Sequence, residues 1–189
     1  MIVLLGTIGV AIGFVGAVGG VITLVSALAS KREAHHRRAI AWIFLMAGGC
    51  LLAVVAMEIG LLRDDFSMQY VASNSTRSTP LLYKIATLWG ALEGSLLLWA
   101  FVLSGYVTAV TISFRWQIQD RLVAWALLTI LVVCIFFFGL LVGPADPFGT
   151  LPVAPLDGDG LNPLLRNHPL MAIHPVMLYL GYVGFTVPF

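Results

Sequence analysis

The sequence predicts an all-α integral membrane protein, a polytopic helical bundle with four complete transmembrane helices, the start of a fifth, and an outer amphipathic interfacial helix. Of its 189 residues, 60% are hydrophobic and 10% are charged, a composition that a water-soluble domain cannot carry on its surface. Four apolar stretches reach the roughly 20 residues that a helix needs to cross about 30 Å of hydrocarbon. Short basic loops and longer loops poor in Lys and Arg alternate between these stretches.

The four predicted spans form one membrane domain, which we expect to be incomplete. They cover residues 2–29, 40–62, 91–114 and 122–143. A fifth apolar run covers residues 174–189 and is too short to span a bilayer, so we expect its continuation on another chain or in a longer sequence. The first span is not a signal peptide, because no Lys or Arg precedes it and its apolar run is about twice the usual length.

The distribution of Lys and Arg predicts the orientation. The loop over residues 30–39 contains Lys31, Arg32, Arg37 and Arg38, and the short loop over residues 115–121 contains two more arginines. The longer loops, residues 63–90 and 144–173, are poor in both residue types. Because basic loops stay in the cytoplasm, we expect a multi-pass protein of a bacterial inner membrane whose N-terminus and both long loops are periplasmic.

Charge and cysteine content exclude several classes of function. The formal net charge of +1 creates no field that would recruit nucleic acid. Cys50 and Cys134 stand alone in apolar runs, without CxxC or CxxCH, and are interpreted as small buried hydrophobic residues. His35 and His36 belong to the basic loop and are interpreted as solvated side chains.

Two features mark the first and second spans. A strip of glycines in the first span predicts close helix packing; its members are Gly6, Gly9, Gly13, Gly16 and Gly20. Glu58, near the outer end of the second span, is a functional candidate because acids inside membranes are rare. The alternative is a carboxylate that reaches the interface and pairs with Arg63.

The first long loop predicts an irregular segment over residues 73–79, followed by an amphipathic helix at the outer interface. Thr79 is expected to cap this helix, with Pro80 at its first position. Its apolar face would carry Leu81, Ile85, Leu88 and Leu92, and its opposite face Lys84 and Thr87.

Trp89 and Glu93 follow at the entrance to the third span. Trp89 fits the aromatic belt of any membrane helix. An acid between Gly90 and Gly94 beside a tryptophan also fits the mouth of a pocket, because small residues allow close backbone approach.

The second long loop is rich in Pro and Gly over residues 144–160 and is expected to be irregular. His174 would stand at the outer mouth of the fifth helix, with Pro175 in its first turn. A neutral imidazole there can ligate iron, although a helix-cap or headgroup contact is the alternative for both His174 and His168.

Three motifs carry a family resemblance. YVASNS at residues 70–75, YKIATLWGALEGSLLLW at residues 83–99 and GLNPLLRNHPLMAIHPVMLYLGYVGFTVPF at residues 160–189 resemble the amino-terminal portion of the CcmF family, which includes NrfE, in the CcmF/CcsA haem lyase superfamily. The resemblance implies a role in cytochrome c maturation. Members take haem from the periplasmic haem chaperone CcmE, work with CcmH-type thiol proteins, and attach haem vinyl groups to the CxxCH cysteines of apocytochrome c.

The resemblance also implies site residues. His174 matches the first of two periplasmic histidines that ligate the haem in transit, and no catalytic residue is assigned. The residues expected to line a haem or partner pocket are Trp89, Glu93, Asn162, Pro175 and Tyr179. The family's His-Pro-Pro is here His174-Pro175-Val176.

In full-length members, the tryptophan-rich WWD loop, the second periplasmic histidine and the two histidines of a permanent b-type haem lie beyond Phe189. We therefore expect the permanent haem site on the remaining CcmF portion, and no complete reaction from this chain alone. The alternative function is that of a non-catalytic membrane subunit of a transporter or respiratory complex, which would bind no haem at His174.

Overall fold

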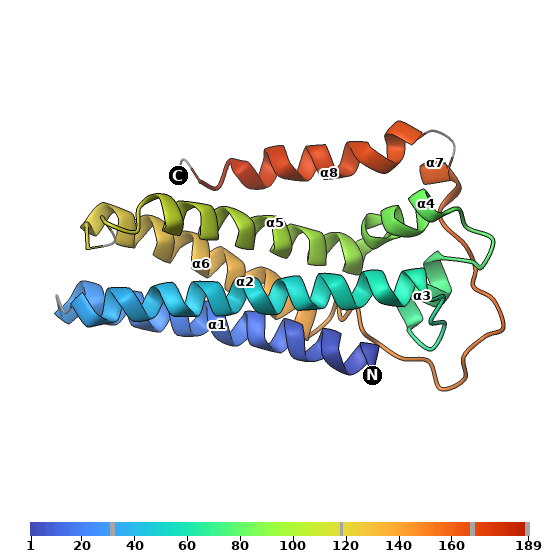
Figure 1. The fold of residues 1–189 in the computed structure, drawn as a ribbon, viewed down its shortest axis with the longest axis horizontal. Coiled ribbons are helices and arrows are strands. Elements are labelled where there is room, and N and C mark those ends of the chain that lie inside the picture. The colour runs from blue at the N-terminus through green and yellow to red at the C-terminus, as the bar shows by residue number, and fades with distance from the viewer. Residues whose placement is uncertain (31–32, 118, 167–168, 188–189) are drawn as a thin grey trace.

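The computed structural model describes residues 1–30, 33–117, 119–166 and 169–187. In this part of the chain, four helices are long and apolar enough to cross a membrane. They are α1 (Ile2–Ser30), α2 (Glu33–Leu62), α5 (Leu92–Ser113) and α6 (Arg121–Val142), and they lie side by side (Figure 1). The predicted all-α polytopic membrane fold is confirmed.

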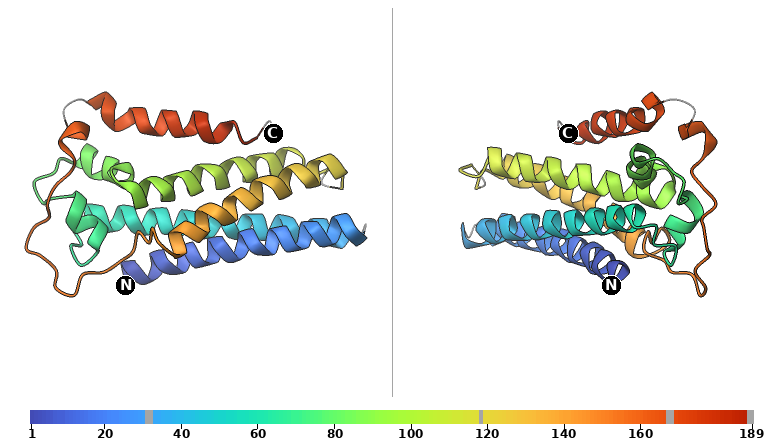
Figure 2. Two further views of the ribbon diagram at one scale, coloured as in Figure 1. Left: turned by 180° about the vertical axis from the view of Figure 1, so that it is seen from behind. Right: turned by 45° about the vertical axis from the view of Figure 1, so that its right-hand side comes forward.

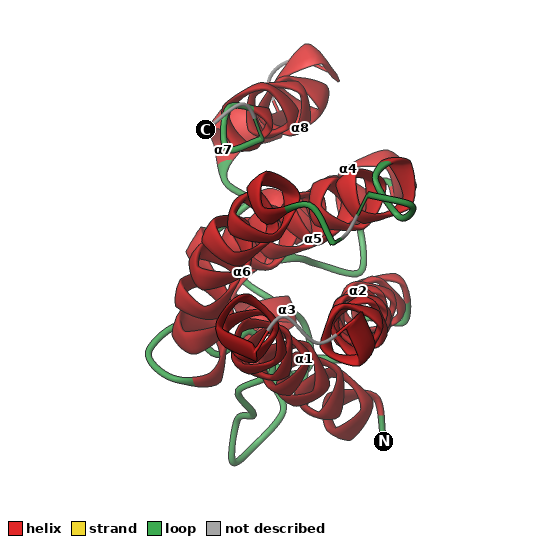
Figure 3. Ribbon diagram, turned by 90° about the vertical axis from the view of Figure 1, so that its left-hand side faces the viewer, coloured by secondary structure: helices red, strands yellow, loops and turns green. Residues whose placement is uncertain are grey.

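The short helices gather at one end of the bundle, beside the N-terminus (Figure 1). They are α3 (Gln69–Asn74), α4 (Leu81–Ala86), the 3-10 helix η1 (Thr87–Trp89) and α7 (Pro163–Arg166). The loop from α6 to α7 crosses this end (Figure 2). The last helix, α8 (Pro169–Gly184), lies along the outer side of α5, away from α1 and α2 (Figure 3).

The glycine strip of α1 makes room for two different neighbours, and all of its predicted members are buried. A Cβ on Gly9 would lie 2.7 Å from the backbone oxygen of Gly49 in α2. A Cβ on Gly13 would collide with the ring of Phe138 in α6. The strip therefore allows α1 to pack closely between α2 and α6, in a setting where the hydrophobic effect does not drive association.

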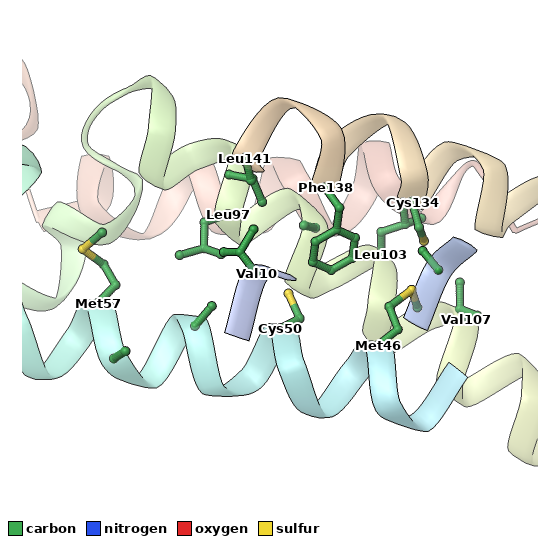
Figure 4. Close-up of a cluster of buried hydrophobic side chains, with 14 of the residues drawn as sticks. Val10, Met46, Cys50, Met57, Leu97, Leu103, Val107, Cys134, Phe138 and Leu141 are labelled. Carbon is green, nitrogen blue, oxygen red and sulfur yellow. The ribbon is translucent and has the colours of Figure 1, made fainter. Parts of the chain in front are cut away.

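The core is formed by buried apolar side chains from all four long helices (Figure 4). Met46 and Cys50 of α2 face Leu103 of α5, and Phe138 and Cys134 of α6 complete the layer. Both cysteines are free and buried, as predicted.

Two helices begin earlier than predicted. α2 begins at Glu33, so most of the expected 30–39 loop is helical; its Glu, Ala and Arg residues are good helix formers that continue the backbone hydrogen bonds into water. His35 and His36 were expected to be solvated, but their side chains are not among those that the structure describes. α8 begins at Pro169 and not at residue 174.

The two long loops pack against each other. Ser73 and Asn74, expected in an irregular segment, belong to α3, whereas the loop over residues 144–160 is irregular as predicted. Backbone hydrogen bonds join the loops: Gln69 N donates to Gly149 O (2.8 Å), Leu151 N to Ser67 O (3.0 Å) and Asp159 N to Ala72 O (2.8 Å). The second loop is therefore held in place by the first.

Candidate functional site

The amphipathic helix α4 turns its polar face toward the protein. Lys84 and Thr87 are buried, whereas Leu81 and Ile85 are exposed on the other side. The predicted division into two faces is confirmed for Leu81, Ile85 and Leu92 but not for Leu88, which is buried together with Thr87. The predicted cap is wrong. Pro80 occupies the N-cap position without a side-chain cap, and the Thr79 hydroxyl accepts a hydrogen bond from Thr76 N (3.1 Å).

An ion pair explains the burial of Lys84. Its Nζ lies 2.5 Å and 2.7 Å from the two carboxylate oxygens of Asp64, which follows α2 with a φ of 53°. The pairing proposed for Glu58 with Arg63 is not formed. Arg63 is exposed, and Glu58 Oε2 is buried without a hydrogen-bond partner in the described part of the chain.

Tyr70 of α3 forms hydrogen bonds with the backbone just before the start of α5. Its buried hydroxyl shares its hydrogen between Thr87 O (2.7 Å) and Leu88 O (3.1 Å), and accepts from Ala91 N (3.3 Å). Burial raises the pKa of Tyr70, so the hydroxyl keeps its proton. A Cβ on Gly94 would collide with this hydroxyl and with Leu88 O. This contact explains why glycine stands one residue after Glu93.

Trp89 and Tyr179 join α8 to η1 and to α5, respectively. Trp89 Nε1 donates to Ala172 O (2.7 Å), and Tyr179 donates from its hydroxyl to Ser95 Oγ (3.3 Å). The Tyr179 ring also packs edge-on against Trp99, with a centroid distance of 5.4 Å. These contacts fix which face of α8 meets the bundle.

His174 lies on the opposite face of α8. Ala172 and Val183 are buried toward the bundle, whereas His174 is exposed, as are Met177 (62%) and Leu178 (40%). Since residues two apart on a helix point to nearly opposite sides, the contact of Ala172 directs His174 outward. The expected place at the helix mouth is wrong: His174 lies inside α8.

Pro175 also lies inside the helix rather than at its start. It has no N–H, so the carbonyl of Met171 in the preceding turn loses its usual hydrogen-bond partner.

Glu93 lies at a different place, in a polar cavity of about 300 Å³. The other lining residues are Gln69, Tyr70, Ser73, Asn74, Gly143, Pro144, Asp146 and Gly149. Glu93 and Ser95 are two apart on α5, so Glu93 points away from Tyr179. Asn162 is exposed just before α7, and its backbone oxygen accepts from Leu165 N (3.0 Å).

The structure therefore distributes the expected pocket residues over separate places. Trp89 and Tyr179 belong to the contacts of α8 with η1 and α5, and Pro175 lies within α8. Glu93 lines the polar cavity, and Asn162 precedes α7. His168 lies outside the described residues. Sequence reasoning missed Tyr70 and Ser95, because their contacts are with residues distant in sequence. The spacing of Gly90 and Gly94 did indicate close packing at this place, and the Tyr70 hydroxyl is what packs against Gly94.

Comparisons with known proteins agree with this architecture. Residues 89–189 match the family model "Cytochrome C assembly protein". The chain is 47% identical over 129 residues to the cytochrome c-type biogenesis protein CcmF of Pseudomonas aeruginosa, covering 68% of this chain and 19% of that protein. It is 43% identical over 155 residues to CcmF of Escherichia coli, covering 80% of this chain and 23% of that protein.

A solved structure of a "Cytochrome c Heme Lyase CcmF" superposes on the whole chain. The TM-score is 0.80 at 31% sequence identity, and the match covers 100% of this chain and 29% of that one. The chain thus spans about a fifth to a quarter of the curated relatives named above. Sequence and fold together show that it belongs to the cytochrome c assembly protein family, in the group of the CcmF proteins.

Proposed function

We propose that this chain serves cytochrome c maturation as one segment of a haem lyase, in which His174 is one axial ligand of the haem in transit. The observation that carries the proposal is the exposed position of His174 on the free face of α8. Trp89 and Tyr179 hold the other face against η1 and α5. The imidazole is therefore available to a substrate while its helix is fixed.

The surroundings of His174 fit a porphyrin. A neutral imidazole nitrogen is a common ligand of haem iron, and the exposed side chains of Ile173, Met177 and Leu178 provide apolar surface on the same part of α8. The second axial ligand, and the permanent b-type haem, would belong to the remaining CcmF portion.

In this proposal the role of the chain is to position haem. A thioether forms when a cysteine S–H adds across a haem vinyl double bond, so no group leaves and orientation determines much of the rate. Trp89, Pro175 and Tyr179 would act as positioning residues for α8. Glu93 and Asn162, which lie away from that contact, would face partner proteins.

The proposed partners follow from the family: the haem chaperone CcmE, a CcmH-type thiol protein, apocytochrome c and the remaining CcmF portion. The proposed location is a bacterial inner membrane, with the N-terminus and both long loops in the periplasm. Its support is charge asymmetry, because Arg37, Arg38, Arg115 and Arg121 lie at the end of the bundle opposite the short helices (Figure 1).

The test is to express the chain together with the remaining portion of a CcmF relative, in a strain without its own CcmF. His174→Ala should abolish holocytochrome c, measured by haem stain, and should change the absorption spectrum of haem bound to the purified complex. His168→Ala, the matched control, should retain most activity, and added imidazole should partly restore His174→Ala. Normal maturation with His174→Ala, together with an unchanged haem spectrum, would contradict the proposal.

A further inference from the structure

An apolar groove lies on the outer surface of α1 and α2, away from the candidate haem site. It measures about 350 Å³ and is lined by Phe14, Val15, Val18, Gly19, Ile22, Thr23 and Trp42. A volume of this order falls in the range of roughly 300–1,000 Å³ found for small-molecule sites. From Phe14 to Thr23 the groove follows α1 for roughly 14 Å, at 1.5 Å per residue. It therefore suits a thin, extended apolar ligand.

Gly19 and Trp42 shape this groove. A Cβ on Gly19 would lie 2.5 Å from the indole of Trp42, so the absence of a side chain lets the indole lie against α1. Val15 (53%) and Ile22 (59%) remain exposed along the groove. In a membrane, such exposed apolar surface meets acyl chains.

Polar side chains follow on α1 and α2 toward the connection between the two helices. The Thr23 hydroxyl bonds to the carbonyl of Gly19 (2.8 Å), and the Ser26 hydroxyl bonds to that of Ile22 (2.8 Å). Arg38 stands four residues before Trp42 on α2, so the two side chains are neighbours on one face. Arg38 is exposed and lies within ion-pair distance of no carboxylate that the structure describes.

The order of these groups along the helices matches a phospholipid. An apolar groove leads to a tryptophan, then to hydroxyl groups, and ends at a guanidinium near the boundary of the hydrocarbon. Basic side chains at this depth attract anionic headgroups, and arginine binds phosphate oxygens in bidentate geometry. We propose that the groove binds one acyl chain of an anionic phospholipid, whose phosphate lies against Arg38.

The experiment is native mass spectrometry of the full chain in detergent, with palmitoyl-oleoyl phosphatidylglycerol and the corresponding phosphatidylcholine at equal concentrations. The first bound lipid should be phosphatidylglycerol with a roughly fivefold preference, as one arginine near an anionic headgroup contributes. Arg38→Gln should remove the preference. Arg115→Gln, a matched loss of an exposed arginine at the same end of the bundle, should keep it.

A second pair of variants tests the groove itself. Ile22→Trp should fill the groove and reduce retention of both lipids, whereas Leu4→Trp, at a similarly exposed position (62%) outside it, should not. Inorganic phosphate should not displace the bound lipid, because the acyl chain contributes to affinity. Equal retention of both lipids by the unmodified chain, an equal effect of Arg115→Gln, or no effect of Ile22→Trp would each overturn the proposal.

Discussion

The indole nitrogen of Trp89 lies 2.7 Å from the carbonyl oxygen of Ala172, and this bond ties the entrance of α5 to α8. Trp89→Phe removes the donor and keeps an aromatic ring, so it should weaken the contact by about 0.5–1.5 kcal/mol. The amides of α8 should then exchange faster in hydrogen–deuterium exchange mass spectrometry. Trp116→Phe, at a position that is 85% exposed, is the control. Unchanged exchange in α8 would show that the bond does not hold the helix.

Gly94 and Gly105 both lie in α5 but have different surroundings. A Cβ on Gly94 would meet Leu88 O and the Tyr70 hydroxyl, whereas a Cβ on Gly105 would meet nothing within 4 Å. Gly94→Ala should lower the midpoint of thermal unfolding in detergent. Gly105→Ala should leave it unchanged or raise it, because alanine favours the helix by up to about 1 kcal/mol. Equal responses of the two variants would be evidence against the close packing at Gly94.

The Lys84–Asp64 pair has little access to water, with side-chain exposures of 10% and 22%. Lys84→Met should destabilise the protein by roughly 3 kcal/mol, since it leaves a mostly buried carboxylate without its partner. Asp64→Asn keeps a residue that tolerates the positive φ, and adding it to Lys84→Met should restore much of the loss. The measurement is a double-mutant cycle of unfolding free energies. Additive effects would mean that the two side chains do not interact.

The carboxylate of Asp157 should make the contact between the two outer loops depend on pH. Hydrogen bonds to its carboxylate from the backbone N–H of Arg77 and of Gly158, both 2.9 Å, hold the pKa of Asp157 below its ordinary value of 3.8. Because the pKa is lowered in the folded state, the contact is fully present above pH 3.8 and is lost as the pH falls through the lower folded value.

The protection factor of the Arg77 amide should therefore be constant from neutral pH to about pH 5 and decrease below about pH 4. Asp157→Asn should give a lower and flatter profile, and Asp159→Asn should behave like the unmodified chain. The measurement is amide exchange corrected for its intrinsic pH dependence. A decrease that persists in Asp157→Asn would assign the effect to another group.

The long helices could be predicted because their length follows from the thickness of the bilayer. The ends of α5 and α6 lie within a residue of the predicted spans. The start of α8 was missed although Pro169 is a signal for a first helical position. The outward direction of His174 could not be predicted, because it depends on Trp89 and Tyr179, which contact α8 from distant parts of the sequence.

The outer end of the bundle was less predictable for a similar reason. Lys84 is buried because Asp64 supplies its counter-charge. Tyr70 connects α3 to the start of α5 by hydrogen bonds to the carbonyls of Thr87 and Leu88. Neither contact leaves a local pattern in the sequence. Glu93 lines a polar cavity together with Tyr70 and Asp146, and its expected role in a haem or partner pocket stays a prediction.

The close approach of Gly9 to Gly49 has a consequence for the order of biosynthesis. Both glycines belong to the first two membrane helices, which leave the ribosome before α5 and α6 are made. N-terminal elements fold first during synthesis, so the α1–α2 hairpin can form this close contact while the remaining helices are still being translated. Phe138 of α6 is translated later, and its ring packs beside Gly13 of α1. The glycine strip of α1 can therefore serve two successive packing steps, first with α2 at Gly9 and then with α6 at Gly13.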